Sequence, residues 1–418
     1  MLYDISIALY RMSVGLASLA YPKARVWIEG RKGLFERLQK SFPEGSGPAI
    51  WIHCASLGEF EQGRPLLEAL RKRFPDCRIL LTFFSPSGYE SRKNHPDADH
   101  VEYLPLDTPG NANRFLDIVK PDLAVFVKYE FWHHFLRGLK SRGVPTLLVS
   151  AIFRPSQPFF KPYGAFWRGM LDVYDRIFVQ DEVSMDLLTR LGLRDRVEVA
   201  GDTRFDRVIA VADSAQGIAR VESFCKDSKV LVAGSTWPED EALLAAYASG
   251  HPDLRLVIAP HEVDEAHIAS LEQRFMDAAR LSRLPQDASH SEVRILIIDG
   301  IGLLSRLYRY ADLAYIGGGF KRSGIHNILE AAVYGKPVFF GPNHGKAREA
   351  GDLMAAGGGF AVRDVLELRR LADPLLADSD ALRQAGDICR DYVERGRGAT
   401  ERILGYMERK RLLTRETN

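Results

Sequence analysis

Two acidic residues in the first half of the chain have the surroundings that proton transfer requires. Glu59 follows the apolar run 49–55. In the first turn of a helix its carboxylate would be stabilised as the anion by free N–H groups and the helix dipole, which suits a general base. Glu130 follows the run 123–127, within a polar and aromatic segment. Capping of a helix by Glu59 and a solvated loop around Glu130 are the alternatives.

The second half offers groups that suit an anion. The run 229–234 ends in Gly234, Ser235 and Thr236, just before a predicted helix. Backbone N–H groups and two hydroxyls converge in such a turn and could hold one phosphate group without a lysine. A simple helix cap is the alternative interpretation.

A glycine-rich segment further along is the most informative stretch. The run 313–316 is followed by glycines, and a predicted helix starts soon after them. Glycines allow close approach of the backbone to a ligand, and a helix start favours negative charge. Glu330 lies one helical turn after His326 and could accept both hydroxyls of a ribose. A glycine turn with a core-packed helix is the alternative, but together these features predict a nucleotide-sugar site comprising Gly317, Gly318, Gly319, Gly324, His326, Asn327 and Glu330.

Short apolar runs alternate with helical patterns, which is typical of βαβ units and parallel sheets covered on both faces. The pattern occurs twice, so an α/β fold with two Rossmann-like doubly wound domains facing a central cleft is predicted. The predicted strands are 49–55, 78–83, 123–127, 146–150 and 176–180 in the first half, and 229–234, 254–259, 294–298, 313–316 and 337–340 in the second.

The predicted domain boundaries follow from these repeats. Residues 21–210 form the first domain and residues 211–395 the second, with the polar segment 212–217 as the linker. After about Asp387 the chain is one long, charged helical pattern, and residues 396–418 are expected to pack back on the first domain.

Residues 1–20 form an apolar helical segment that Arg11 interrupts and that Lys23 and Arg25 follow. Arg11 argues against a signal peptide and makes a membrane-spanning helix costly, whereas an interfacial helix tolerates a charge. A helix on the membrane surface and a helix packed on the protein's own first domain both remain open.

Composition excludes other classes. The chain of 418 residues has 56 Lys and Arg against 55 Asp and Glu, which gives no global argument for nucleic-acid binding. Its four cysteines form no C-x-x-C pair and indicate a reducing compartment, the cytoplasm. Asp97 and Asp99 lie in a polar loop, and His261, Glu262 and His267 lack zinc-binding spacing, so no metal or other cofactor is expected.

From about Tyr21 to the end, the order of motifs resembles the bacterial transferases of 3-deoxy-D-manno-octulosonic acid (Kdo) that act in lipopolysaccharide synthesis. The motifs that carry the resemblance are Gly30-Arg31 with Gly33, His53-x-x-Ser56-x-Gly58-Glu59, Glu130 with Trp132, Gln180-Asp181-Glu182, Gly201 with Phe205-Asp206, Gly234-Ser235-Thr236 and His326-Asn327-x-x-Glu330-x-Ala332.

This resemblance implies a GT-B glycosyltransferase that transfers Kdo, with inversion, from CMP-Kdo to a lipid A precursor at the cytoplasmic face of the inner membrane. Glu59 and Glu130 would be catalytic, and His261 would join the donor-binding residues. Arg31, Ser56 and Gly58 would lie on the acceptor side. A GT-B enzyme that uses a UDP-sugar and a non-catalytic nucleotide-binding, membrane-associated protein are the rival interpretations.

The chain departs from the family pattern at two places that matter for the site. Lys128 stands where the family usually has its first acid, so only Glu130 and Trp132 of that motif are kept. His261 stands where the family has an arginine. A guanidinium contact to the donor phosphate is therefore missing, or Lys321 or Arg322 supplies the charge.

Overall fold

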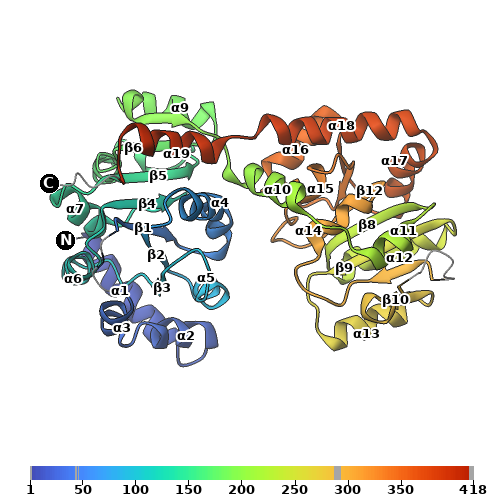
Figure 1. The fold of residues 1–418 in the computed structure, drawn as a ribbon, viewed down its shortest axis with the longest axis horizontal. Coiled ribbons are helices and arrows are strands. Elements are labelled where there is room, and N and C mark those ends of the chain that lie inside the picture. The colour runs from blue at the N-terminus through green and yellow to red at the C-terminus, as the bar shows by residue number, and fades with distance from the viewer. Residues whose placement is uncertain (1, 43–44, 46, 287–292, 414–418) are drawn as a thin grey trace. The chain divides into compact units, whose positions relative to one another are not determined.

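The computed structural model describes residues 2–42, 45, 47–286 and 293–413 and divides the chain into two compact units (Figure 1). Unit 1 comprises Met1–Asp206 and Gly398–Asn418, and unit 2 comprises Arg207–Arg397. The sequence predicts boundaries after 210 and 395 instead. Helix α10 (Thr203–Ser214) runs through the first part of the predicted linker.

Unit 1 is built on a sheet of seven strands, all paired in parallel. Their order reverses direction between β1 and β4, as in a doubly wound sheet. The central strands are buried along their whole length, because helices cover both faces. In sheet order the strands are β3 (His100–Tyr103), β2 (Arg78–Phe83), β1 (Ala49–Cys54), β4 (Leu123–Val127), β5 (Thr146–Ala151), β6 (Arg176–Val179) and β7 (Val197–Val199).

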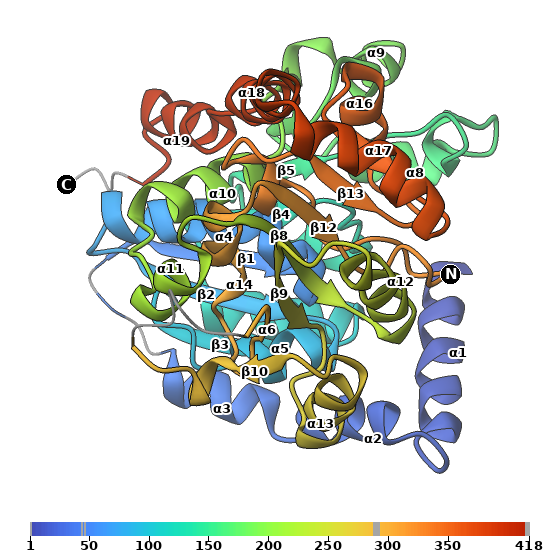
Figure 2. The same cartoon turned by 90° about the vertical axis from the view of Figure 1, so that its right-hand side faces the viewer.

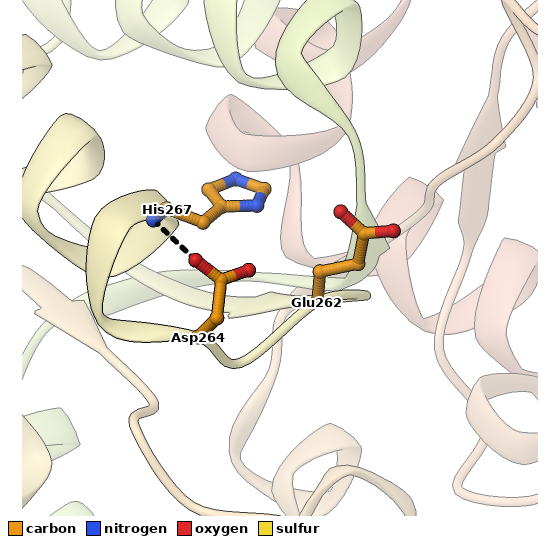
Figure 3. A group of neighbouring side chains, drawn as sticks. All are labelled: Glu262, Asp264 and His267. Carbon is orange, nitrogen blue, oxygen red and sulfur yellow. Dashed lines mark hydrogen bonds between the residues drawn. The ribbon is translucent and has the colours of Figure 1, made fainter.

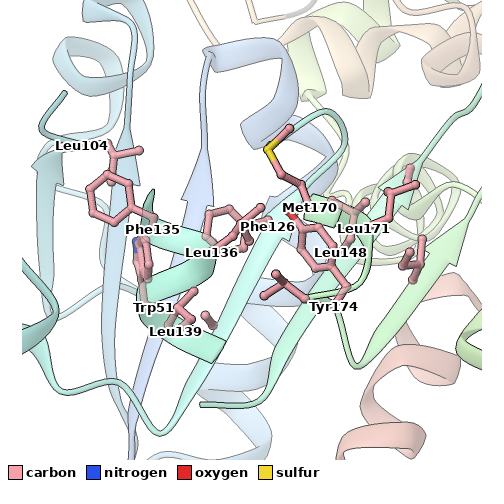
Figure 4. Close-up of a cluster of buried hydrophobic side chains, with 14 of the residues drawn as sticks. Trp51, Leu104, Phe126, Phe135, Leu136, Leu139, Leu148, Met170, Leu171 and Tyr174 are labelled. Carbon is pink, nitrogen blue, oxygen red and sulfur yellow. The ribbon is translucent and has the colours of Figure 1, made fainter. Parts of the chain in front are cut away.

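Two hydrophobic clusters cover the two faces of this sheet. On one face Trp51 and Phe126 pack with Phe135 of α7 (Figure 4). On the other, Ile50 and Ile52 share a cluster with α4 and α19. The helices of unit 1 are α1 (Leu2–Ala17), α2 (Pro22–Gly30), α3 (Leu34–Ser41), α4 (Leu57–Arg73), α5 (Pro86–Arg92), α6 (Pro109–Val119), α7 (His133–Ser141), α8 (Ala165–Leu171), α9 (Glu182–Thr189), the first turn of α10, whose remaining residues belong to unit 2, and α19 (Ala399–Arg409).

The end of the chain confirms that a C-terminal helix packs back on the first unit. Ile403 and Met407 of α19 are buried in the unit 1 core. The prediction of one long helix is wrong, because α18 ends at Arg395 and α19 begins at Ala399. Gly398, which directly precedes α19, has φ 102°, a left-handed backbone that glycine adopts readily and that interrupts the helical path.

Unit 2 repeats the architecture with a second sheet of seven parallel strands (Figures 1 and 2). Its order reverses direction between β8 and β12. In sheet order the strands are β10 (Ala278–Arg280), β11 (Ile295–Ile297), β9 (Leu254–Pro260), β8 (Lys229–Thr236), β12 (Leu313–Ile316), β13 (Val338–Phe340) and β14 (Gly359–Ala361). The helices are α11 (Ala219–Cys225), α12 (Pro238–Ser249), α13 (Glu265–Arg274), α14 (Leu304–Leu307), α15 (Leu329–Ala332), α16 (Arg348–Ala356), α17 (Val365–Ala377) and α18 (Ser379–Arg395).

Helix α1 touches unit 1 through one side and leaves the other exposed. The Tyr3 hydroxyl donates to Asp107 at 2.5 Å, and the Tyr10 ring lies 5.9 Å from that of Trp27. None of the helix is buried. Its exposed apolar side chains recur every three or four residues, which places them in one stripe: Leu2, Ile5, Leu9, Met12 and Leu16. Within the described residues, every helix falls short of the length and hydropathy that a membrane crossing needs.

Candidate functional site

In each unit the predicted site residues lie at the carboxyl ends of the strands that flank the reversal of strand order. In unit 1, Glu59 follows β1 and Glu130 follows β4. In unit 2, Ser235 ends β8 and His326 follows β12. Doubly wound sheets bind their ligands at these points, because the neighbouring loops diverge to opposite faces there. Each unit therefore contributes one candidate site.

Glu59 occupies the first turn of α4. Ser56 caps this helix, since its hydroxyl oxygen accepts the Glu59 N–H at 3.4 Å, and the same hydroxyl donates to Glu59 Oε2 at 2.9 Å. Glu59 is half-buried and Gly58 beside it is exposed. A Cβ atom at Gly58 would meet only the Ser56 hydroxyl within 4 Å, so the helix start is open at this point.

The pKa of Glu59 depends on burial and on neighbouring charges as well as on its place at the helix start. Burial raises the pKa of the Glu59 carboxyl, and the charge of Glu130 raises it further. The Ser56 hydrogen bond and the charges of His53 and Lys128 act in the opposite direction without cancelling the rise. The net shift is thus opposite to the stabilised anion that the sequence predicts. It moves the pKa toward neutral pH, where a general base works best.

Glu130 is buried in a polar network beneath this site. Its side chain accepts the indole N–H of Trp132, and its main-chain oxygen accepts the hydroxyl of Tyr174. His53 Nε2 lies 3.1 Å from Glu130 Oε2, close enough for an ion pair but not aligned as a hydrogen bond. Both side chains are at most 2% exposed, so the alternative of a solvated loop around Glu130 is wrong.

When His53 carries a single ring proton, the other neighbours of the ring decide which nitrogen holds it. The Trp51 indole only donates, so the Thr82 hydroxyl accepts from it at 2.8 Å. That hydroxyl has one proton to give, and His53 Nδ1 at 2.8 Å is nearer than the Ile52 carbonyl at 3.4 Å. With Nδ1 as the acceptor, the ring proton of neutral His53 lies on Nε2 and faces Glu130.

Arg31, predicted to contact the acceptor, is held by the protein itself. Its guanidinium donates to the main-chain oxygens of Trp27, Phe84 and Leu104 at 2.7–3.1 Å. The guanidinium carbon also lies 3.9 Å from the ring centroid of Trp27. These contacts give Arg31 a structural role within unit 1. Its contact with the acceptor stays a prediction.

Lys128 is a residue that sequence analysis left without a role. It comes directly after β4 with φ 77°, a left-handed conformation that is costly outside glycine and often found at functional sites. Its side chain is half-buried, and burial lowers the pKa of its ammonium. The charge of Glu59 acts in the opposite direction, so the two groups stabilise each other.

In unit 2, the Gly-Ser-Thr turn is shaped by packing as much as by ligand access. A Cβ atom at Gly234 would lie 2.0 Å from the Tyr308 hydroxyl, so only glycine fits there. Ser235 has φ 53° and is half-buried. Thr236 is fully buried and its hydroxyl donates to Glu241 at 3.1 Å. Of the two hydroxyls predicted to meet a phosphate, that of Ser235 is the one left accessible.

Asp240 ties this turn to the glycine loop after β12. Its carboxylate accepts the Trp237 N–H at 3.0 Å and the Gly318 N–H at 2.9 Å, and the Tyr315 hydroxyl at 2.9 Å. The side chain is buried, and burial raises the pKa of its carboxyl. Its place in the first turn of a helix is the one sequence signal that could have marked Asp240, since the partner Gly318 lies 78 residues away.

The glycines after β12 bring segments of backbone together. A Cβ at Gly317 would lie 2.2 Å from the Ser235 carbonyl oxygen, and one at Gly319 would lie 2.4 Å from the Gly341 nitrogen. These glycines therefore permit contact between the ends of β8, β12 and β13. The predicted close approach to a ligand stays a prediction.

His326, Asn327 and Glu330 do not share one helix, contrary to the sequence prediction. The backbone is left-handed at Gly324, with φ 91°, and the helix α15 begins only at Leu329. Asn327 lies just before it, where its side-chain oxygen accepts the Leu329 N–H at 3.3 Å while its amide donates to Glu330 at 3.2 Å.

Three aromatic rings stack at the carboxyl ends of adjacent strands. The Trp237 and His261 ring centroids are 4.6 Å apart, and those of His261 and His326 are 4.4 Å apart, with interplanar angles of 30° and 29°. The Trp237 indole donates to His326 Nε2 at 3.3 Å. Lys321 Nζ lies 3.0 Å from the Trp237 ring centroid. Sequence analysis gave Trp237 no role.

Glu262, Asp264 and His267 form a group in which one ligand atom from each lies within 4.8 Å of the others (Figure 3). Two of these three residues already have partners within the protein. Asp264 caps α13 by accepting the His267 N–H at 3.0 Å, and His267 Nε2 lies 2.9 Å from the Glu241 carboxylate. A helix cap and a buried pair account for this geometry, and the expectation that no metal is needed stays a prediction.

Relatives of known activity resemble the chain over most of its length. Residues 32–207 match the family model for 3-deoxy-D-manno-octulosonic-acid transferase (kdotransferase). The chain is 30% identical to the 3-deoxy-D-manno-octulosonic acid transferase of Aquifex aeolicus over 345 residues, which cover 80% of this chain and 89% of that protein. It is 26% identical to the Haemophilus influenzae transferase over 421 aligned residues, 95% of each chain.

The fold is also that of solved two-domain enzymes. The UDP-GlcNAc 2-epimerase from Neisseria meningitidis, bound to UDP-GlcNAc, aligns with a TM-score of 0.60 over 86% of this chain and 100% of its own, at 15% identity. At that identity the similarity shows the shared GT-B fold and nothing about the substrate. The sequence similarity is more specific, and the chain belongs to the 3-deoxy-D-manno-octulosonic acid transferase family of glycosyltransferases.

Proposed function

We propose that the protein transfers Kdo from CMP-Kdo to a lipid A precursor, with inversion at the anomeric carbon. Membership of the Kdo transferase family carries this proposal. The geometry supports it, since unit 1 offers a carboxylate of raised pKa and unit 2 offers imidazoles and a lysine suited to a phosphate.

In the proposed reaction, Glu59 removes the proton of the acceptor hydroxyl. The hydroxyl oxygen forms a bond to the anomeric carbon of Kdo while the bond from that carbon to the phosphate oxygen breaks. CMP leaves with the electron pair, and the proton stays on Glu59 until solvent takes it up. Positioned base catalysis of this kind contributes a factor of about 10² to 10⁴ to the rate.

The groups in unit 2 would stabilise the leaving phosphate without a metal. His261, His326 and the accessible hydroxyl of Ser235 supply hydrogen bonds, and Lys321 supplies charge. CMP has a single phosphate, so less negative charge develops than on a diphosphate. Transfer should therefore persist in excess chelator, and its complete loss there would contradict this step.

For localisation, we propose that the exposed stripe of α1 lies in the cytoplasmic surface of the inner membrane. An apolar helix face flanked by basic residues suits an anionic bilayer surface, and Arg11, Lys23 and Arg25 supply that charge. Full-length protein should sediment with vesicles that contain anionic lipid. Leu9→Ser should reduce that fraction, whereas Ile7→Ser, on the half-buried side of the helix, serves as the matched control.

The activity is tested by incubating the protein with freshly generated CMP-Kdo and a tetra-acylated lipid A precursor and measuring the mass of the acceptor. A gain of one or more Kdo masses is expected, with inhibition by CMP but not by UDP. No mass gain under conditions where CMP binds would contradict the acceptor. Inhibition by UDP alone would favour an enzyme that uses a UDP-sugar.

A further inference from the structure

The stacked cluster of unit 2, defined as Trp237, His261, His326 and Lys321, combines side chains from three adjacent strand ends. Trp237 follows β8, His261 follows β9, and Lys321 and His326 follow β12. These strands are neighbours in the order β9-β8-β12, which includes the reversal of the sheet. The cluster therefore lies where a doubly wound sheet binds its ligand.

Lys321 brings a charge that no carboxylate in the described part of the chain neutralises. Its ammonium lies 3.0 Å from the Trp237 ring centroid, and the contact with the face of the ring is its one described interaction. A cation over an aromatic ring gains about 0.5–2 kcal/mol, yet the ring leaves the ammonium's other side free to donate hydrogen bonds. The contact with the ring thus positions the ammonium but leaves its hydrogen-bond donors for a ligand.

The backbone fixes the position of this lysine. Its N–H donates to the Gly318 carbonyl at 3.0 Å, and its carbonyl accepts the Gly324 N–H at 3.1 Å. Gly318 is in turn held by Asp240 at 2.9 Å. Because the main chain at Lys321 is already held by hydrogen bonds, this loop needs little further ordering when an anion binds.

The two histidines are neutral hydrogen-bonding groups at neutral pH. Burial lowers the pKa of His326 to about 4, and the charges of His261 and Lys321 add to the effect. Burial likewise lowers the pKa of His261, with Lys321 adding to it and Glu262 opposing it. Because His326 Nε2 accepts the Trp237 indole, the proton of neutral His326 lies on Nδ1 and is available to a ligand.

We propose that Lys321 contacts the phosphate of the nucleotide donor and replaces the arginine that this chain lacks at position 261. The neighbouring Arg322 is exposed, and its described contact is through its main-chain oxygen, which accepts the Lys346 ammonium at 2.9 Å. Arg322 therefore provides a matched control one residue away. The identity of the nucleotide as CMP rests on the proposed function, but the contact to phosphate does not depend on the base.

The test compares the affinity of the full-length protein for CMP and for cytidine, which lacks the phosphate, by calorimetry or NMR titration. Lys321→Met should weaken CMP binding roughly 10- to 100-fold, as expected for loss of a charge-assisted contact, and should leave cytidine binding unchanged. Lys321→Arg should recover part of the loss. Arg322→Met should change neither affinity, and thermal unfolding checks that each variant is folded.

Two results would overturn the assignment of Lys321. Equal weakening of CMP and cytidine in Lys321→Met would mean that the lysine only supports the stacked rings. A loss of CMP affinity in Arg322→Met but not in Lys321→Met would assign the contact to Arg322. If wild-type protein binds UDP instead of CMP, the proposed donor is wrong, and the same comparison with UDP and uridine still decides the role of Lys321.

Discussion

The sites of the two units sit at the same place in the same kind of sheet but are built differently. In unit 1, the polar groups behind Glu59 contact one another, because Trp51, Thr82, His53 and Glu130 form a buried chain of contacts. In unit 2, the stacked cluster keeps donors that no described residue occupies, at Lys321 Nζ and His326 Nδ1. The buried chain of unit 1 shifts the pKa of one carboxylate, whereas the stacked cluster of unit 2 keeps donors that can bind an anion.

This difference suggests a division of labour. The residues of unit 1 would control a proton, and those of unit 2 would bind the charge of the donor. Substitutions in one unit should then leave the other unit's task intact, and three experiments test that expectation.

The largest effect is expected at Glu59. Glu59→Gln keeps the size of the side chain and a group that can accept the Ser56 hydroxyl, but it cannot take up a proton. The kcat of Kdo transfer should fall by about 10² to 10⁴. CMP affinity, measured by calorimetry, should stay within a factor of two or so of the wild type, since the donor groups lie in unit 2. A kcat near the wild-type value would remove Glu59 from the reaction.

A smaller effect is expected from Gly319→Ala, which acts on the other site. The added methyl group would lie 2.4 Å from the Gly341 nitrogen and force the loop after β12 away from the end of β13. The free energy of unfolding should fall by about 1–3 kcal/mol, with weaker CMP binding. Gly351→Ala in α16, where nothing lies within 4 Å of the added group, is the control and should raise stability by about 0.5–1 kcal/mol. Equal stability of the two variants would show that the loop yields freely.

The smallest effects are shifts in the pH dependence of transfer. The charge of Glu130 raises the pKa of Glu59 and that of Lys128 lowers it. Glu130→Gln should therefore move the acidic limb of kcat to lower pH, and Lys128→Met should move it to higher pH, each by less than about one unit. The position of the limb is the readout, because kcat itself also changes if either side chain touches substrate. Shifts of the same sign in both variants would contradict this account of the pKa.

How far the sequence predicts the fold depends on burial. The central strands β1, β4, β8 and β12 are apolar runs buried on both faces, and sequence analysis predicted all four. It missed β3, β7, β10 and β14, which lie at the edges of the two sheets. These strands have only three or four residues, and β3, β7 and β10 include polar or charged ones such as His100 and Glu102, so no long apolar run marks them.

In the site, residue types were easier to predict than contacts. A strand followed by Ser56 and Glu59 indicates a capped helix start, and that arrangement is present. The helical placement of His326 was wrong, because the chain turns at Gly324 in a conformation that a helical pattern does not reveal. Contacts such as Trp237 with His326, 89 residues apart, depend on the packing of whole strands and have no local signal.

The pH dependence of kcat, measured for wild-type protein and Glu59→Gln at saturating CMP-Kdo and acceptor, tests the role of Glu59 most directly. A base must be ionised, and its pKa is raised above the ordinary value of 4.5. Wild-type kcat should therefore fall tenfold per pH unit below an apparent pKa higher than 4.5. The residual activity of Glu59→Gln should lack that limb. The same limb in both proteins would show that another group accepts the proton.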